Sequence, residues 1–357
     1  MLYISKLSIN TIEFDMRMNT LALGMLLAVF CSCTQRSGVP LSPEVPEVDS
    51  VLVDTLSDVQ STEEVRLLTG DDVLLAKELL YDRYTLEDSY PYKDTMRFFQ
   101  WDKIKEQLAF LENIQLDSVC WAVLQNYKNR NGEAPLVKKF RRNSYGRVAD
   151  TLGVERYQSV PLYHPADTLV PVCYGRDGEL VYLLGASSTF VRVQPVRRKD
   201  EWLVPSRYVS VLGDSVVFHH AVFVDRQNQN TASLERADKG RWLVRSMNPV
   251  TTGRCLPPYA QPTPLGMFVL QEKKVKMIYC KDGSKELGGF APYASRFTNG
   301  AYIHGVPVNA PNKNQIEYSP SLGTTPRSHM CVRNATSHAR FIFDWAPVRQ
   351  SVIFVLE

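Results

Sequence analysis

The sequence has no excess of charge of either sign. Its 41 lysine and arginine residues face 38 aspartate and glutamate residues, which gives a formal net charge of +3. A dedicated nucleic-acid-binding protein would usually present a concentrated basic surface, so we expect no nucleic-acid partner. Hydrophobic residues make up 44% of the 357 residues, which is enough for packed cores in two or three domains and excludes wholesale disorder.

Motifs for cofactors and metals are also missing. No glycine-rich motif that could hold a phosphate precedes a predicted helix, so a nucleotide is not indicated and we expect no cofactor. The pair His219-His220 lacks Cys, Asp or His partners at the spacing that a zinc site requires. We therefore predict no metal site and interpret this pair as part of a surface or an edge strand.

The N-terminal region has no apolar run long enough to cross a membrane. The uncharged run Leu21–Phe30 has 10 residues, whereas a helix needs about 20 apolar residues to span a bilayer. Arg17 precedes this run and small residues follow it, which is the layout of a secretory signal. We predict a signal peptide over residues 1–33; a short buried helix or a membrane anchor is the alternative.

The end of this segment, Cys31-Ser32-Cys33, resembles a bacterial lipoprotein signal. The resemblance implies a lipid on the cysteine at the cleavage site and a periplasmic protein anchored to a bacterial membrane. Cys33 is the favoured position because Ser32 before it is small, whereas Cys31 follows the bulky Phe30. Acidic residues at 13 and 15 are unusual in such a signal, so Met16 or Met18 is an alternative start.

Export changes the interpretation of the cysteines. Five of the 7 cysteines remain beyond residue 33. An odd number in an oxidising compartment leaves at least one thiol outside any disulfide, and Cys331 is the natural candidate. The pairing of the other four stays open, and they are equally compatible with buried apolar positions: Cys120, Cys173, Cys255 and Cys280.

The chain up to residue 150 is predicted to comprise a tether and a helical region. Residues 34–64 are rich in Pro, Ser, Val, Glu and Asp and predict a flexible linker. Residues 65–150 show helical spacing in three runs, and we predict helices there: after Asp71 or Asp72 through Leu80, from Trp101 through Leu111, and from Asp117 or Ser118 through Tyr127. The basic run at 138–142 is interpreted as a solvated face, with contact to anionic wall polymer or lipid as the alternative.

From residue 151 to residue 213 the period changes to two. Short runs of β-forming residues alternate with turn signals and predict a small β-barrel: Val160–Tyr163, Val170–Tyr174, Leu180–Leu184, Phe190–Val193, Trp202–Val204 and Tyr208–Leu212. This region, which includes the turn Arg176-Asp177-Gly178, loosely resembles a bacterial SH3-like domain. The resemblance implies binding of wall peptide or a partner, with a structural spacer as the alternative.

The last region, residues 214–357, carries an ordered set of motifs. A strand ending in Val224-Asp225 with glutamines nearby is followed by a strand that Thr252-Gly253 closes. Next come Pro262-Thr263-Pro264-Leu265-Gly266-Met267-Phe268, then His304-Gly305, then Ser328-His329-Met330-Cys331-Val332-Arg333. As a set these motifs resemble the L,D-transpeptidase catalytic-domain family, which cross-links bacterial peptidoglycan. The resemblance implies a mostly β chain with a β-sandwich-like catalytic domain and an N-terminal helical region.

The resemblance also implies the chemistry. Cys331 matches the nucleophile, whose thiolate attacks the carbonyl of a peptidoglycan stem peptide. His304 matches the general base and acid. His329 is a secondary catalytic or structural member, since residues two apart in an extended segment face the same way. Support of the loop and binding of the substrate or the oxyanion are expected from the remaining site residues: Ser328, Met330, Arg333, Gly305 and Tyr302.

The sequence departs from the family in two places. Met330 stands where the family usually has Gly, so either the loop has an ordinary backbone conformation or Met330 covers part of the site. The insert at residues 307–326 has four prolines and predicts a lid or an acceptor-selecting wall. Two alternatives therefore accompany the transpeptidase interpretation: an L,D-carboxypeptidase or endopeptidase with the same residues, and a non-catalytic wall-binding lipoprotein.

Overall fold

The computed structural model describes residues 66–116, 120–127, 160–256 and 259–357. The chain divides into two compact units, residues 1–63 and 64–357, and the description concerns the second. The predicted signal peptide with Cys33, the linker over 34–64 and the basic run at 138–142 lie outside the described residues. Where the structure is described, no helix is long and apolar enough to cross a membrane.

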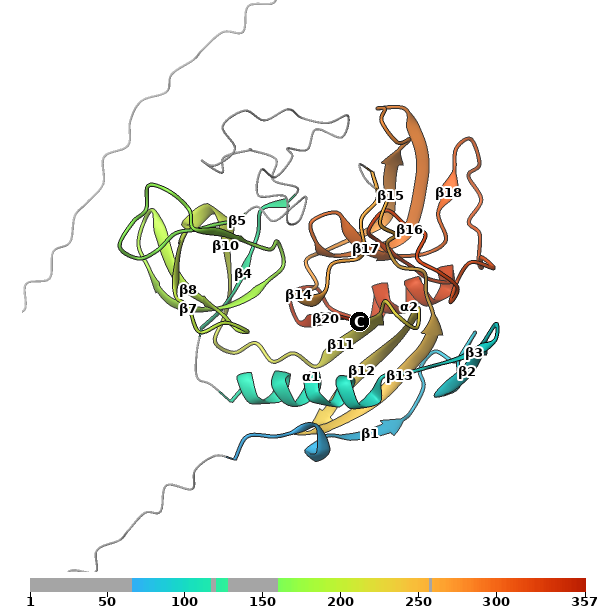
Figure 1. Cartoon of the computed structure of the whole chain (residues 1–357), viewed down its shortest axis with the longest axis horizontal. Helices are drawn as coiled ribbons and strands as arrows, with labels where there is room; N and C mark the ends of the chain where they lie inside the picture. The colour runs from blue at the N-terminus through green and yellow to red at the C-terminus, as the bar shows by residue number, and fades with distance from the viewer. Residues whose placement is uncertain (1–65, 117–119, 128–159, 257–258) are drawn as a thin grey trace, which may run out of the picture. The chain divides into compact units, whose positions relative to one another are not determined.

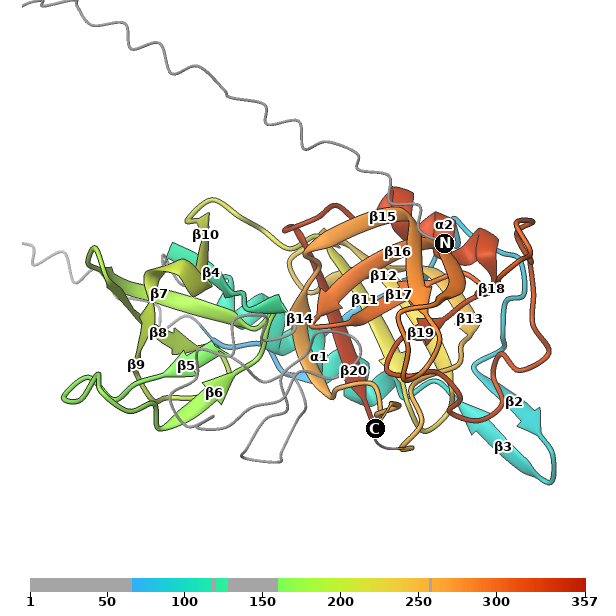
Figure 2. The ribbon, with the colours of Figure 1, turned by 90° about the horizontal axis from the view of Figure 1, so that it is seen from above.

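The described residues are mostly β, as predicted, and three sheets account for most strands. The large sheet has the order β1 (Leu74–Lys77), β13 (Arg241–Pro249), β12 (Asn230–Asp238), β11 (His220–Asp225), β20 (Ser351–Leu356) and β14 (Gly266–Val269). The hairpin sheet has β15 (Glu272–Cys280), β16 (Leu287–Thr298), β17 (Ala301–His304) and β19 (Val332–Arg333), with β18 (Val308–Asn309) paired to β16. Figure 2 shows β15, β16 and β17 side by side.

The remaining elements are a small sheet, two short pairs of strands and two α-helices. The small sheet has the order β10 (Val209–Gly213), β4 (Cys120–Leu124), β7 (Leu180–Ala186), β8 (Phe190–Pro195) and β9 (Trp202–Pro205). The short pairs are β5 (Val160–Leu162) with β6 (Cys173–Gly175), and β2 (Ser89–Tyr92) with β3 (Thr95–Phe98). The helices are α1 (Trp101–Ile114) and α2 (Thr336–Trp345).

The large sheet has a hydrophobic core on each of its two faces. Successive side chains of a strand point to opposite faces and therefore contribute to different cores. On β11, Val222 and Val224 pack with Ile303 of β17 and Val332 of β19, so the large sheet and the hairpin sheet enclose one core. The neighbouring Phe223 belongs to a second core on the opposite face. Two sheets packed in this way confirm the β-sandwich-like fold predicted for residues 214–357.

Helix α1 covers the second face of the large sheet (Figure 1). Ile104, Leu108 and Leu111 recur every three or four residues and are all buried in the core that this helix shares with the sheet. The helix predicted from this spacing is therefore confirmed.

The helix predicted from Asp71 through Leu80 is wrong. A short 3-10 turn over Gly70–Asp72 leads into strand β1, which pairs in parallel with β13 at the edge of the large sheet. An apolar run this short fits a strand as well as a helix. Here it forms a strand because the backbone groups of β13 are available as hydrogen-bond partners. The strand also joins the N-terminal part of the chain to the large sheet.

The helix predicted from Asp117 or Ser118 through Tyr127 is also wrong. Cys120–Leu124 forms β4, which lies between β7 and β10 in the small sheet. Four of its five residues are buried, so the apolar residues show no alternation that could have distinguished a strand from a buried helix. Five of the six strands predicted between residues 160 and 212 are confirmed in position, whereas the run Val170–Tyr174 forms a strand only at its end, since β6 spans Cys173–Gly175. The SH3-like character of this region stays a prediction.

A buried ion pair joins α1 to the large sheet. Glu112 is 2% exposed and accepts hydrogen bonds from Arg236 and from the indole of Trp242, at 2.9 Å in each case. We expect Glu112→Ala to lower the free energy of unfolding by about 3–5 kcal/mol, because Arg236 would keep its charge without its partner. Urea unfolding measures the change.

The exposed pair Arg340–Asp344 of α2 provides the control. Asp344→Ala removes the same kind of contact at the surface, where ion pairs contribute about 0–1 kcal/mol. Equal losses in the two variants would contradict the assignment of the α1 contact as a buried pair.

Candidate active site

A cleft of about 1250 Å³ opens beside the hairpin sheet. Seven of the eight site residues predicted from the sequence line it: Tyr302, His304, Ser328, His329, Met330, Cys331 and Arg333. The eighth, Gly305, lies next to His304 in the chain and is buried. The tertiary structure thus brings together residues that the sequence separates by the long insert.

Residues Thr251–Gly253, which follow β13, hold the Cys331 segment on both sides of the thiol. Thr251 and Arg333 exchange two backbone hydrogen bonds of 2.9 Å, and the carbonyl of Thr252 accepts from the amide of Ser328 at 3.0 Å. Buried Gln229 fixes Thr252 in turn, since its amide group both accepts from and donates to that residue, at 2.9 and 2.7 Å. The Thr-Gly motif therefore has a direct role in holding the segment with Cys331.

The Pro-Thr-Pro motif holds the middle of the same segment. The hydroxyl of Thr263 donates to the carbonyl of Met330 and accepts from the amide of Gly253, both at 2.9 Å. The amide of Gln261 donates to the carbonyl of His329 at 2.7 Å. Gly253 permits this close approach, because a Cβ there would lie 2.9 Å from the Cα of Met330.

Met330 takes the first of the two conformations expected for it. It has no positive φ, and its side chain is only 5% exposed in the core between the two sheets. The hydroxyl of Ser328 donates to the carbonyl of Cys331 and closes the turn around Met330. A side chain at position 330 is thus compatible with the loop, because it points into the core.

His304 ends β17 and lies opposite Arg333 of β19 in a parallel pair. Its side chain is 4% exposed, and its Nδ1 lies 2.6 Å from the carbonyl oxygen of Gly305. A carbonyl oxygen only accepts, so Nδ1 carries the proton of the neutral ring and Nε2 is left as a base. Burial lowers the pKa of His304 from its ordinary value of 6.5 to about 4, which keeps the ring neutral near pH 7.

Gly305 allows helix α2 to approach the catalytic strand. A Cβ at this position would lie 2.7 Å from the hydroxyl oxygen of Thr336 and 2.8 Å from a ring carbon of Pro292. The amide of Gly305 also donates to the carbonyl of Pro292 at 2.9 Å. The glycine of the His-Gly motif is therefore a packing requirement, and its carbonyl orients the imidazole.

Cys331 contacts the turn between β16 and β17. Its Sγ lies 3.4 Å from the carbonyl oxygen of Gly300 and donates to it. The thiol is partly exposed in the cleft. None of the five described cysteines is joined in a disulfide.

Arg333 brings a positive charge into the wall of the cleft. Burial lowers the pKa of Arg333, and the negative charge of the Cys331 thiolate acts in the opposite direction. Its Nε is buried and finds no hydrogen-bond partner among the described residues. Arg333 as a residue is only partly buried and lines the cleft, so its guanidinium is suited to a carboxylate that enters with a ligand.

His329 does not rely on Cys331 for its contact. Its Nε2 lies 2.8 Å from Oδ2 of Asp282, in the loop between β15 and β16, and its side chain is 47% exposed. This pair links the Cys331 segment to the tip of the β15–β16 hairpin. Asp282 was not identified from the sequence, because no motif connects the two positions.

Tyr302 meets a residue from outside the catalytic sheets. Its hydroxyl lies 3.3 Å from that of Tyr127, which also lines the cleft, and 3.4 Å from a carboxylate oxygen of Glu272. Burial and the neighbouring Tyr127 raise the pKa of Tyr302. Tyr127 was not identified as a site residue, because it follows β4 and the sequence indicated a helix there.

The insert at 307–326 lines the cleft only at its beginning, where Pro307, Asn309 and Ala310 contribute. Its later part packs elsewhere: the carbonyl of Glu317 accepts from the first amide of α2 at 2.8 Å, and the ring of Tyr318 lies 4.6 Å from that of Tyr84. The first residues of the insert are thus in position to act as a wall.

No group of His, Cys, Asp and Glu side chains suited to a metal ion occurs in the part of the chain that the structure describes. The groups that line the cleft include the thiols of Cys331 and Cys280, the neutral imidazole of His304, several cations and the carboxylate of Asp282. This arrangement can form an acyl-thioester and move protons between the thiol and an amine.

A comparison with protein-family models matches residues 219–354 to the YkuD family, the L,D-transpeptidase catalytic domain. No curated protein matches the chain. Solved structures that resemble it include an L,D-transpeptidase from Mycobacterium smegmatis, with 16% identity over 50% of this chain and 82% of that chain and a TM-score of 0.32. An L,D-transpeptidase from Mycobacterium tuberculosis H37Rv has 17% identity over 51% and 92%, also with a TM-score of 0.32.

A third similar structure is matched over a smaller share of its length. It is a fused Zn-dependent amidase/peptidase and peptidoglycan-binding domain-containing protein from Clostridium acetobutylicum ATCC 824, with 18% identity and a TM-score of 0.28. The match covers 38% of this chain and 51% of that chain. The present chain thus spans about half the length of that protein.

The buried neutral imidazole predicts a pH dependence of stability. Unfolded His304 takes up a proton near pH 6.5, whereas folded His304 does so only near pH 4. The unfolded chain therefore binds more protons in this window, and the free energy of unfolding falls as the pH falls. We expect His304 to account for a loss of about 3 kcal/mol between pH 7 and pH 4.

Urea unfolding at several pH values measures this term as the difference between the wild type and His304→Asn. The variant should lose less stability on acidification, because asparagine does not titrate. Contributions from other buried groups, such as His338, cancel in the comparison. Parallel pH profiles of the two proteins would contradict the assignment.

Proposed function

We propose that the chain is a peptidoglycan L,D-transpeptidase with Cys331 as nucleophile and His304 as general base and acid. The match of residues 219–354 to the L,D-transpeptidase catalytic-domain family supports this proposal. The observation that carries this proposal is the shared cleft. A partly exposed thiol, a neutral imidazole with a basic Nε2 and the guanidinium of Arg333 all line it.

In the first half-reaction, Nε2 of His304 takes the proton of the Cys331 thiol. The sulfur then forms a bond to the carbonyl carbon of a donor stem peptide. Negative charge develops on the carbonyl oxygen, and the backbone amides of Met330 and Cys331 are the candidate donors to it. The C–N bond breaks, the protonated His304 gives its proton to the departing amine, and a thioester remains.

In the second half-reaction an amine of another stem peptide attacks the thioester. His304 accepts the proton of this amine and returns it to the sulfur as the C–S bond breaks. The new amide bond is the cross-link. If water takes the place of the amine, the same steps give hydrolysis, which is the carboxypeptidase or endopeptidase alternative.

The charge of the cleft supports a peptide substrate that carries carboxylates. Its lining includes five cationic residues and one carboxylate, Asp282: Lys274, Lys276, Lys281, Lys285 and Arg333. The excess of positive charge raises the local concentration of an anionic ligand. Arg333, with its buried Nε, provides the planar donor group that suits a carboxylate near the reacting thiol.

Incubation of the purified protein with disaccharide-tetrapeptide, followed by mass spectrometry, tests the proposed function. We expect cross-linked dimers with the wild type and none with Cys331→Ala, because the substitution removes the sulfur that forms the thioester in the proposed mechanism. His304→Ala should reduce the rate by about 10²–10⁴-fold, as expected for loss of a general base.

The products separate the alternatives. Tripeptides without dimers would contradict the transpeptidase proposal and support the carboxypeptidase or endopeptidase alternative. If the protein binds the disaccharide-tetrapeptide without turnover, and Cys331→Ala still binds it, both enzymatic proposals would be contradicted. This result would support the wall-binding interpretation. Ser337→Ala serves as a control for the handling of the variants, because Ser337 lies in α2 and does not line the cleft.

We further propose that the chain is a periplasmic lipoprotein with its lipid on Cys33. The support is the order of charged, apolar and small residues over 1–33. Cells that express the chain should incorporate labelled palmitate into it, and Cys33→Ser should abolish this label while Cys31→Ser retains it. Equal labelling of the two variants would contradict the assignment.

A further inference from the structure

The turn between β6 and β7 places a fully buried carboxylate beside the hairpin sheet. Asp177 is 0% exposed and lies outside the segment that matches the catalytic domain. Its side chain accepts hydrogen bonds from four nitrogen donors: Asn126 N at 3.1 Å, Gln271 Nε2 at 3.0 Å, Arg296 Nη1 at 2.5 Å and Asn299 N at 2.7 Å. Burial raises the pKa of Asp177. Every one of these neighbours donates, so the site is arranged for the carboxylate form.

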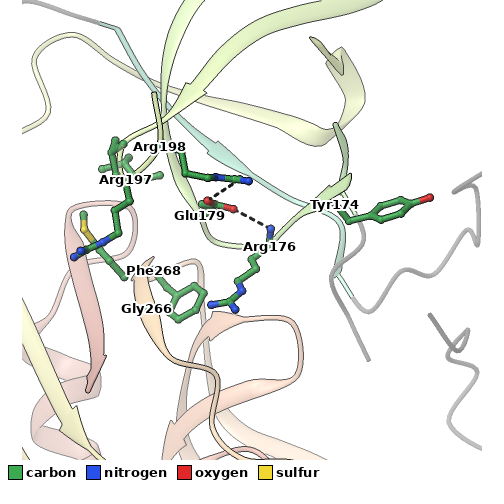
Figure 3. A pocket seen from close by; sticks show the side chains of 10 residues that line it. Tyr174, Arg176, Glu179, Arg197, Arg198, Gly266 and Phe268 are labelled. Carbon is green, nitrogen blue, oxygen red and sulfur yellow. Dashed lines mark hydrogen bonds and ion pairs between the residues drawn. The ribbon is translucent and has the colours of Figure 1, made fainter. Parts of the chain in front are cut away.

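The turn is fixed against both sheets of the catalytic domain. Gly178 has a φ of +90°, and a Cβ there would lie 2.1 Å from the carbonyl oxygen of Phe297 in β16. Its own carbonyl accepts from the amide of Val269 in β14 at 2.9 Å. Arg176 points in the same direction, toward Gly266 and Phe268 of β14 (Figure 3). Its guanidinium donates to the carbonyl of Leu265, the residue before that strand. Glycine at 178 is thus required for this contact.

The amide that Asp177 holds belongs to the turn that contacts the candidate nucleophile. Asn299 has a φ of +42°, a left-handed conformation that is uncommon outside glycine but that asparagine adopts more readily than most residues. The next residue, Gly300, supplies the carbonyl oxygen that lies 3.4 Å from Sγ of Cys331. One peptide unit therefore separates the group held by Asp177 from the group that orients the thiol.

We propose that Asp177 is a positioning residue for Cys331, which it orients through the Asn299–Gly300 turn. The inference rests on the proposed role of Cys331 as nucleophile. It makes the β6–β7 turn part of the catalytic apparatus, although this turn lies in the region predicted to be a wall-binding or spacer module. Asp177 accepts from the amide of Asn299 and from the side chain of Arg296 in β16, and these two contacts tie the turn to the end of the strand before it.

Asp177→Asn tests the proposal because it keeps the shape of the side chain and removes its charge. Alkylation of Cys331 by iodoacetamide, followed on its tryptic peptide across pH, reports the thiol without any peptidoglycan substrate. We expect the midpoint of this profile to move to lower pH, because a carbonyl that accepts from S–H stabilises the protonated thiol and its displacement removes that effect. In the transpeptidase assay we expect kcat to fall roughly tenfold with KM little changed, since a misplaced reacting group affects the chemical step.

Glu179→Gln is the matched control. Glu179 lies at the end of the same turn, and its substitution by glutamine removes the same charge. Its carboxylate, however, pairs with Arg198 at 3.3 Å and accepts from the amide of Arg176 (Figure 3). We expect the wild-type alkylation profile and kcat in this variant. Circular dichroism and thermal unfolding confirm that each protein is folded.

If Asp177→Asn does not fold, Arg296→Lys is measured instead, because it weakens the hold on Asp177 while it keeps the positive charge. A folded variant with the wild-type midpoint overturns the proposal, even if its kcat is lower, since loss of stability alone would explain that result. If the wild-type protein shows no transpeptidation, only the proposed function is contradicted. A shifted alkylation midpoint in Asp177→Asn would then still support the positioning role.

Discussion

The candidate site depends on the backbone hydrogen bonds that hold both flanks of Cys331. Thr251–Gly253 bonds to residues before and after the thiol, and Thr263 bonds to the peptide between them. These contacts join three sequence motifs that are far apart in the chain. They require the hydroxyl of Thr263 and the absence of a side chain at Gly253, and they accommodate Met330 with its side chain in the core.

Burial gives the groups around this segment their chemical properties. His304 is neutral because it lies between strands and helix α2, and the carbonyl of Gly305 directs its second nitrogen away as a base. Arg333 keeps an unpaired buried nitrogen in the cleft wall. Asp177, also fully buried, has its charge matched by donors of the hairpin sheet. Burial thus keeps the imidazole of His304 neutral and places the charge of Asp177 among matched hydrogen-bond donors.

Sequence patterns predicted the fold where periodicity was unambiguous. The three- and four-residue spacing of Trp101–Leu111 gave helix α1, and alternation with turn signals gave the strands between 160 and 212. The patterns failed at β1 and β4, where short apolar runs fit both a helix and a strand. Pairing with β13, and with β7 and β10, decided those two elements, and such partners lie far away in the sequence.

The sequence by itself indicated the resemblance to the L,D-transpeptidase catalytic domain and the candidate reactive residues, because their types and order reflect local chemical requirements. A thiol, an imidazole followed by glycine, and a Pro-Thr-Pro segment are properties of the chain. Only the tertiary structure decided the tautomer of His304, the partner Asp282 of His329 and the arrival of Asp177 beside the nucleophile's turn. These depend on burial and on contacts between distant segments, which follow from packing and leave no fixed spacing in the sequence.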